Sequence, residues 1–160
     1  MIPEKRQIII PREDSVFWMD QNGIWHNEHG RFEHPKIIHY FNRSIQKDDQ
    51  GYFLSQTMDG SEDGVEEKVY FPCEDTAVFV ADLIVKDKGD TIDLVLNIGE
   101  KQCLEPGGLF IRDDSLFVQT RDHLIKFNQQ SLVKMSSLLD ETDQGLALTL
   151  GSQVYIIPEK

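Results

Sequence analysis

The chain has 160 residues, about the length of one domain, and its 39% hydrophobic and 28% charged residues are typical of a globular protein. Its 28 acidic and 16 basic residues give a formal net charge of −12, which repels a phosphate backbone, so we expect no nucleic-acid partner. The apolar runs are too short to span a bilayer, and residues 1–7 lack the apolar stretch of a secretory signal. We therefore expect no membrane segment and a cytoplasmic location.

A pattern in the first half of the chain recurs in the second half. The motif Asp-Gln-Gly at 49–51 returns 94 positions later, at 143–145. The apolar residues before each motif share the i, i+3, i+7 spacing of one helix face: Ile38, Phe41 and Ile45, then Leu132, Met135 and Leu139. We predict one domain, 1–160, built by internal duplication, in which a bridge at about 73–107 joins units at about 16–72 and 108–158.

In the first half, Asn22-Gly23 is a strong signal for a hairpin turn. Pro35 suits the first position of a helix, with His34 as its N-cap, and Gly51 is expected to end that helix. The predicted elements, in chain order, are strands at 8–10, 16–19 and 24–27, a helix from Pro35 to about Lys47, and strands at 52–56 and 68–71.

The bridge is expected to be a hairpin, because residues 91–98 alternate between apolar and polar as in a half-buried strand. Asn128 is a better N-cap residue than its counterpart His34. The elements predicted here are strands at 78–85, 91–98, 109–112, 116–119 and 124–127, a helix at 129–140, and strands at 146–150 and 154–157. The fold class is thus α+β and mostly antiparallel, with two strand-strand-helix-strand-strand units joined by a β-hairpin bridge.

Four of the five histidines fall in one short segment, together with two glutamates: His26, Glu28, His29, Glu33, His34 and His39. Imidazole and carboxylate are the ligands of zinc and iron sites. The histidine spacing matches no ligand pair on a helix, however, and the second copy has no histidine at the corresponding positions. We predict no metal and no other cofactor, and interpret these histidines as solvated or capping residues.

An acidic loop, Met58 to Glu66, contains the sequence Asp59 to Gly64, which follows the first six positions of a calcium-binding loop. The twelfth position is Tyr70 instead of glutamate. We therefore interpret the segment as a solvated loop.

Aromatic residues gather in the first copy. The second copy has mostly these residues at the matching positions: Phe110, Phe117, Met135, Leu146 and Ala147. Such divergence is expected if one copy keeps a binding face and the other completes the core. The residues that we predict to form a binding site are Trp18, Trp25, His26, His34 and Tyr52. No catalytic residue is assigned, because the sequence has no Gly-x-Ser-x-Gly, Walker or dinucleotide-binding motif.

Several short motifs resemble a family of small bacterial proteins, the domain of unknown function DUF1285. The motifs are 20–25, 30–32, 49–54, 67–69 and 74–80, and the resemblance covers about Asp20 to Ile157. It implies an α+β fold with repeated structural motifs and a part in signal transduction, and it supplies no catalytic residues. The acidic insertion Met58 to Glu66 departs from the family pattern.

Together these features favour a cytoplasmic, non-enzymatic interaction or sensing module that binds a protein partner or a small ligand. Two alternatives stay open. One is a small metal-dependent enzyme that uses the segment His26 to His39, and the other is a small-molecule binding protein with a cleft between its two units. The sequence does not specify an oligomeric state.

Overall fold

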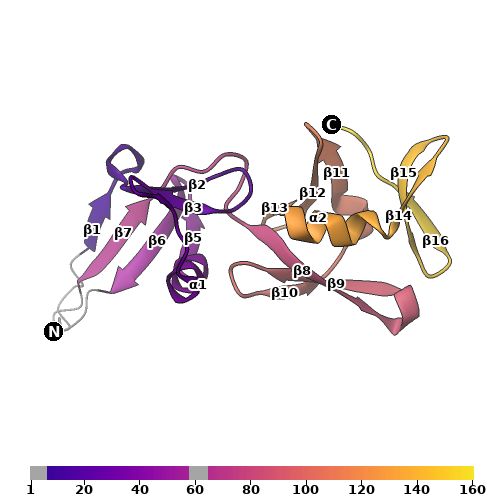
Figure 1. Cartoon of the computed structure of the whole chain (residues 1–160), viewed down its shortest axis with the longest axis horizontal. Helices are drawn as coiled ribbons and strands as arrows, with labels where there is room; N and C mark the ends of the chain where they lie inside the picture. The colour runs from indigo at the N-terminus through magenta and orange to yellow at the C-terminus, as the bar shows by residue number, and fades with distance from the viewer. Residues whose placement is uncertain (1–6, 58–64) are drawn as a thin grey trace. The chain divides into compact units, whose positions relative to one another are not determined.

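The computed structural model describes residues 7–57 and 65–160. The chain forms two compact units, of which the first ends at Ala77 and the second begins at Val78 (Figure 1). Both consist mainly of antiparallel strands and contain one α-helix each. The α+β, mostly antiparallel fold predicted from the sequence is confirmed.

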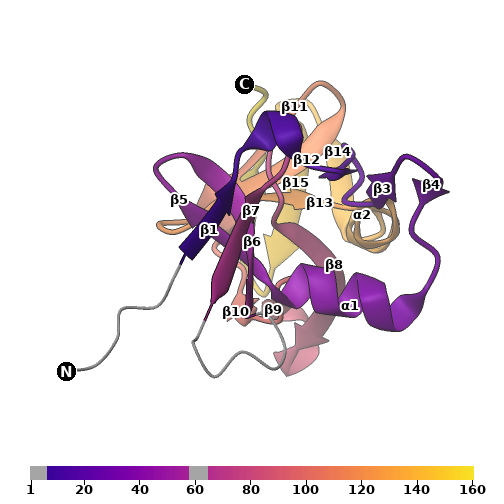
Figure 2. The ribbon, with the colours of Figure 1, turned by 90° about the vertical axis from the view of Figure 1, so that its left-hand side faces the viewer.

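The first unit contains two sheets and helix α1. Its elements are β1 (Gln7–Ile10), a 3-10 turn (Arg12–Asp14), β2 (Phe17–Met19), β3 (Trp25–Asn27), β4 (Gly30–Arg31), α1 (Pro35–Arg43), β5 (Ile45–Asp48), β6 (Gly51–Thr57) and β7 (Glu66–Tyr70). One sheet has the order β1-β7-β6-β5, in which only the β1–β7 pair is parallel. The other is the antiparallel sheet β2-β3-β4, called the hairpin sheet below. Figure 2 shows α1 extending beneath the hairpin sheet.

The core of the first unit is a cluster of aromatic rings. Trp25 is 1% exposed, and its indole meets the rings of Phe71 and Phe41 edge-on, with centroids 4.7 and 5.2 Å apart. Phe17 contacts the same three rings. Edge-to-face packing of this kind stabilises a core beyond the effect of burial alone. The cluster joins the hairpin sheet to α1.

The second unit contains a six-stranded sheet, a three-stranded sheet and helix α2. Its elements are β8 (Phe79–Lys86), a 3-10 turn (Asp87–Gly89), β9 (Thr91–Leu96), β10 (Lys101–Cys103), a second 3-10 turn (Pro106–Gly108), β11 (Leu109–Arg112), β12 (Ser115–Gln119), β13 (Leu124–Phe127), α2 (Gln129–Ser136), β14 (Leu139–Thr142), β15 (Gly145–Leu150) and β16 (Gln153–Ile156). The larger sheet has the order β10-β9-β8-β13-β12-β11, with β8 and β13 parallel, and the smaller is β14-β15-β16. Met135, which is fully buried, is part of the core on the inner side of α2.

The predicted hairpin bridge is present as β8 and β9, which pair antiparallel. It belongs to the second unit, because β8 also pairs with β13. Each unit contains the order of three antiparallel strands, a helix and three antiparallel strands: β2 to β7 in the first and β11 to β16 in the second. The duplication and its boundaries remain a prediction.

Both helices are shorter than the sequence predicts. Helix α1 ends at Arg43 and α2 at Ser136, where the predicted ends were about Lys47 and Asp140. The residues that follow form β5 and β14, and Ile45, which was assigned to the helix, is buried at the start of β5 opposite Leu54. The prediction was wrong here because a helix and a hairpin strand can bury the same apolar residue.

The repeated Asp-Gln-Gly motif forms a hairpin turn in each unit, and Gly51 does not end the helix as predicted. Gly51 and Gly145 have φ values of 122° and 116°, a region that favours glycine. In both turns the backbone N–H of the glutamine donates a hydrogen bond to the side chain two residues before it. The acceptors are Oδ1 of Asp48, at 2.9 Å, and Oγ1 of Thr142, at 3.2 Å. The motif thus specifies a tight turn after a short strand.

Within the described ranges, neither α-helix has the length and apolar composition needed to cross a membrane. Most of the predicted acidic loop, including Asp59 to Gly64, lies outside the described residues.

Candidate functional site

Two of the predicted binding residues face each other on the outer side of the hairpin sheet. Trp18 on β2 lies directly opposite His26 on β3. Their rings are stacked, with centroids 5.8 Å apart and planes inclined by only 7°. Trp18 is 41% exposed, whereas its neighbours Phe17 and Met19 are buried. The alternation along β2 therefore presents the Trp18 indole to solvent while the flanking side chains enter the core.

Asp20 holds His26 in place. Its Oδ2 lies 2.7 Å from Nε2 of His26, and its Oδ1 accepts hydrogen bonds from the amides of Asn22 and Ile24. Burial raises the pKa of the Asp20 carboxyl, but the bonds from His26 and the two amides outweigh this effect and leave the pKa below its ordinary value. The carboxylate thus organises the β2–β3 turn and fixes the imidazole.

Arg31 extends this arrangement to the third strand, because it lies directly opposite His26 on β4. Trp18, His26 and Arg31 therefore form a row across the outer face of the hairpin sheet, called the outer row below. Indole, imidazole and guanidinium groups are planar, and tryptophan and arginine are enriched among the residues that dominate protein interfaces.

The other predicted binding residues are not part of the outer row. Trp25 belongs to the aromatic core, and its Nε1 donates a hydrogen bond of 2.8 Å to Oδ1 of Asn42. Tyr52 is 8% exposed and its hydroxyl is 2.9 Å from that of Thr76; burial raises the pKa of Tyr52 despite this bond. His34 is exposed at the N-cap of α1, where its side chain makes no capping hydrogen bond.

The histidine-rich segment is spread over the hairpin sheet, a turn and the start of α1. His29 in the turn contacts Glu28 at 3.4 Å, and both side chains are 83% exposed. Across residues 7–57 and 65–160, no group of three or more His, Cys, Asp or Glu side chains is placed to hold a metal ion. The side chains of the metal-enzyme alternative therefore do not converge in this structure.

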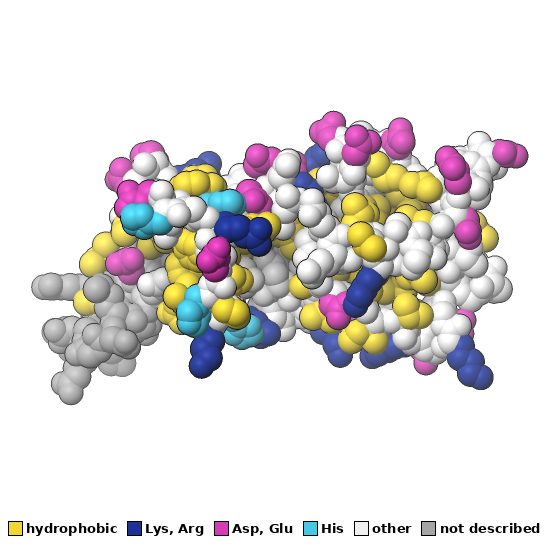
Figure 3. All heavy atoms as spheres, in the orientation of Figure 1, with side chains coloured by type: hydrophobic (Ala, Val, Ile, Leu, Met, Phe, Trp, Pro, Cys, Tyr) yellow, Lys and Arg dark blue, Asp and Glu magenta, His cyan; other side chains and the backbone are white. Residues whose placement is uncertain are grey.

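A groove runs along α1, a feature that was not predicted from the sequence. Its volume is about 640 Å³, and the residues along its walls are mostly apolar: Val16, Phe17, Asn27, Phe32, Lys36, Ile37, Tyr40, Phe41, Gln56, Glu67 and Val69. A smaller hollow of about 280 Å³ adjoins it and shares Asn27, Phe32 and Ile37 with it. Together they are called the α1 groove below. Figure 3 shows hydrophobic, histidine and basic side chains close together over the hairpin sheet and α1.

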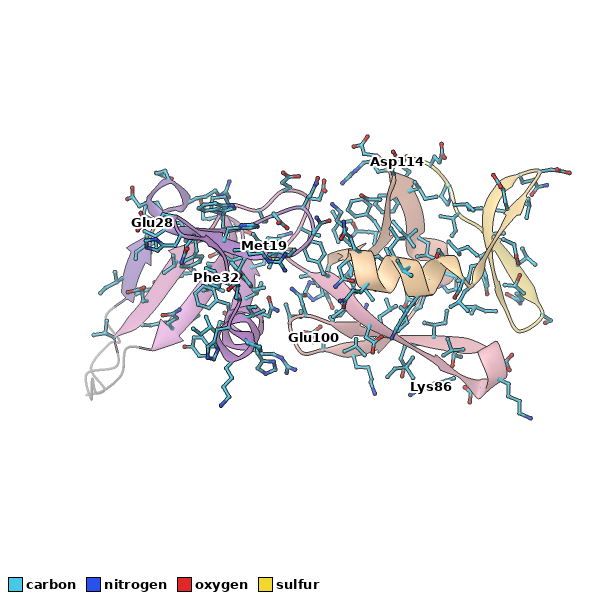
Figure 4. All side chains as sticks on the ribbon, in the orientation of Figure 1. Met19, Glu28, Phe32, Lys86, Glu100 and Asp114 are labelled. Carbon is cyan, nitrogen blue, oxygen red and sulfur yellow. The ribbon has the colours of Figure 1, made fainter. Side chains whose placement is uncertain are left out.

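Helix α1 has no fully buried residue, and several of its apolar side chains line this groove. Phe41 anchors the helix, with its ring edge-on to Phe17 at 5.1 Å and to Phe32 at 5.0 Å. Phe32 itself lies between the hairpin sheet and α1 (Figure 4). By contrast, Ile37 and Tyr40 are 47% and 52% exposed. One side of the helix is thus packed, and an adjacent apolar strip faces the groove.

A signal for this strip was present in the sequence. The apolar i, i+3, i+7 stripe that recurs in both halves of the chain contains Ile38 and Phe41. Ile37 and Tyr40 lie outside this stripe and are also apolar or aromatic. A nine-residue helix with four such residues has a wider apolar face than one packing contact needs. Val16, which is 73% exposed, could not have been distinguished from a strand core residue.

A polar cluster lies on the other sheet of the unit. Oδ2 of Asp48 accepts hydrogen bonds of 2.6 Å from both Nζ of Lys68 and the hydroxyl of Tyr70. The bond from Lys68, followed by that from Tyr70, lowers the pKa of Asp48 to about 2. Lys68 Nζ also lies 4.3 Å from the centre of the Phe53 ring. Every polar group of this cluster has a partner, which is typical of a structural ion pair.

The fold is similar to that of two solved structures, although the chain matches no protein family model and no curated relative. One is a DUF1285 family protein from Silicibacter pomeroyi DSS-3, with a TM-score of 0.61, 12% identity, and coverage of 96% of this chain and 83% of that one. The other, a DUF1285 family protein from Shewanella baltica OS155, has a TM-score of 0.51, 16% identity, and coverage of 76% of this chain and 91% of that one. At these identities the likeness concerns the fold. The chain has a DUF1285-like fold, and the predicted resemblance is confirmed at that level.

Proposed function

We propose that the first unit is a protein-interaction module, and that its α1 groove receives an apolar segment of a partner. One observation carries this proposal: Val16, Ile37 and Tyr40, all exposed, line one continuous groove beside the ring of Phe41. Apolar patches that persist on a protein surface are commonly binding sites. Covering them would be favourable by about 25 cal/mol for each Å² of apolar surface removed from water.

The outer row supports the same role. Arg31 belongs both to this row and to the smaller hollow of the α1 groove, so the two features adjoin on the same unit. Trp18 offers a rigid, half-exposed indole that loses little entropy on binding, because it is already stacked on His26. The role that we infer is interaction or sensing, in agreement with the signalling role that the family resemblance implies.

Site-specific photo-cross-linking in the native cell tests this proposal. A benzoylphenylalanine at position 40 or 37 should give a discrete cross-linked product that can be identified by mass spectrometry and reconstituted from the purified partner. Val133 on α2 is 70% exposed and supplies a matched control position in the second unit. No product at positions 37 and 40, or the same products at position 133, would refute the module.

A further inference from the structure

We propose, resting on that function, that the segment bound in the α1 groove is acidic: a bulky apolar side chain enters the groove while neighbouring carboxylates contact the cationic edge of α1. This assigns a chemical class to the partner.

Positive charge is concentrated on and just after α1. Residues 35–47 contain Lys36, Arg43 and Lys47 and no aspartate or glutamate, in a chain whose formal net charge is −12. Lys36, His39 and Arg43 are spaced i, i+3 and i+7, so they follow one edge of the helix. All three are exposed. Lys36 and Arg43 therefore make the edge next to the apolar strip of Ile37 and Tyr40 cationic.

Three basic residues at the α1 groove and the α1 edge have no counter-ion within residues 7–57 and 65–160. Among the described residues, Arg31, Lys36 and Arg43 form no ion pair, whereas Lys68 binds Asp48 at 2.6 Å and Lys134 binds Asp82. An unpaired exposed cation loses little hydration and no existing bond when a partner carboxylate approaches. The three side chains are thus available for an intermolecular contact.

The lining of the α1 groove contains as many acidic as basic residues. Glu67 lines the larger part and Glu33 the smaller, while Lys36 and Arg31 line the same two parts, so the lining itself carries no excess charge. Such a lining suits the apolar anchor. Beyond the lining, Arg43 continues the positive charge along the α1 edge, which suits a carboxylate that flanks the apolar anchor.

A peptide fits this surface better than a membrane or a second copy. A bilayer contacts protruding apolar side chains, whereas here the apolar residues line a concave groove of about 640 Å³. A symmetric contact between two copies through this groove would bring their cationic α1 edges together, whereas an acidic segment complements that edge. An amphipathic segment that places an apolar face in a groove is a common mode of recognition.

Three synthetic helical peptides test the inference with the full-length protein: one of Leu and Glu, one of Leu and Lys, and one of Ser and Glu. Fluorescence anisotropy of labelled peptide should show binding of the Leu/Glu peptide about tenfold or more tighter than either of the others. The affinity should fall as salt is added. In NMR spectra, the methyl groups of Ile37 should shift on binding.

Two double variants separate the apolar and the charged contributions. Ile37→Ser with Tyr40→Ser should abolish binding of the Leu/Glu peptide. Lys36→Glu with Arg43→Glu should reverse the preference, so that the Leu/Lys peptide now binds at least tenfold better than the Leu/Glu peptide. Lys101→Glu with Arg121→Glu, two exposed sites in the second unit, changes the net charge equally and should leave the preference unchanged.

The outcomes distinguish this inference from the proposed function. Equal binding of the Leu/Glu and Leu/Lys peptides would overturn the acidic class and leave the module intact. If none of the peptides binds but position 40 still cross-links to a partner, the acidic class is likewise overturned and the module is retained. Co-sedimentation with phosphatidylserine vesicles that Lys36→Glu with Arg43→Glu removes would replace the peptide with a lipid surface, and concentration-dependent dimerisation blocked by Ile37→Ser with Tyr40→Ser would replace it with a second copy.

Discussion

Trp25 and Asn42 join the hairpin sheet to helix α1. The indole Nε1 of Trp25 donates a hydrogen bond of 2.8 Å to Oδ1 of Asn42, and the indole ring is 1% exposed. Asn42 follows Phe41, whose ring packs against the same indole. The bond therefore fixes the helix that forms one wall of the α1 groove.

Replacing Asn42 with Leu should destabilise the first unit. The buried indole N–H would lose its acceptor, which costs about 1–3 kcal/mol of unfolding free energy. Trp18 and Trp25 are the two tryptophans of the chain, so urea unfolding followed by tryptophan fluorescence reports on this unit. His39→Ala, at an exposed position of the same helix, should leave the midpoint unchanged. A midpoint for Asn42→Leu equal to that of the wild type would show that the bond does not hold the helix.

Acid should weaken the first unit through Asp48. The pKa of this carboxyl is about 2 in the folded state, against an ordinary value of 3.8, because Lys68 and then Tyr70 donate hydrogen bonds to it. A group whose pKa is lowered by folding contributes stability above its unfolded pKa, and this contribution is lost as pH falls from about 4 to about 2. The fluorescence-monitored urea midpoint of the wild type should therefore decrease over this range.

The variant Asp48→Asn separates this effect from the titration of other carboxylates. It should lower the midpoint at neutral pH, and its further decrease between about pH 4 and pH 2 should be smaller than that of the wild type. Asp49→Asn, at the exposed neighbouring position, should retain the wild-type slope. Parallel curves for the wild type and Asp48→Asn would mean that Lys68 and Tyr70 do not stabilise the carboxylate.

The elements most strongly predicted from the sequence were those with a local cause. Asn22-Gly23 specifies the β2–β3 turn, where Gly23 has a φ of 76°. The alternation of residues 91–98 specifies β9, in which Ile92 and Leu94 are buried. Where two structures satisfy the same pattern, as at Ile45, the apolar spacing was insufficient, and pairing of β5 with β6 decided the outcome.

The candidate site was predictable only in part, for a related reason. The sequence singled out Trp18 and His26, and the structure stacks them. It also singled out Trp25 and Tyr52, which are buried, because residue type alone does not tell an aromatic ring of the core from one at a surface. The α1 groove depends on the packing of Phe41 against Phe17 and Phe32, which lie outside α1, and helix periodicity does not predict such contacts.

The two helices should respond differently to loss of their N-cap side chains. In α2, Oδ1 of Asn128 accepts a hydrogen bond of 2.8 Å from the amide of Ser131, whereas the side chain of His34 caps nothing in α1. Asn128→Ala should therefore cost about 1 kcal/mol and reduce the protection of α2 amides in hydrogen-exchange mass spectrometry. His34→Ala should leave the protection of α1 amides unchanged. Equal effects of the two substitutions would show that the cap bond of Asn128 does not stabilise α2.

Gly107 and Gly108 provide a matched pair for testing the packing of the second unit. Neither has a positive φ, so alanine is compatible with the backbone at both positions. A Cβ on Gly108 would lie 2.5 Å from the carbonyl oxygen of Gln119 and 3.2 Å from Cγ2 of Val118, whereas a Cβ on Gly107 would meet no atom within 4 Å. Only at Gly108 do neighbouring atoms leave no room for a Cβ.

Gly108→Ala should therefore destabilise the second unit by about 1–3 kcal/mol, because the chain before β11 must move away from the backbone of β12. Gly107→Ala should be neutral or slightly stabilising, since alanine reduces the entropy of the unfolded chain. Hydrogen exchange of the β11 and β12 amides measures both effects in the same unit. Faster exchange in Gly108→Ala alone would verify the close approach. Similar exchange in the two variants would mean that β11 can shift relative to β12 at little cost.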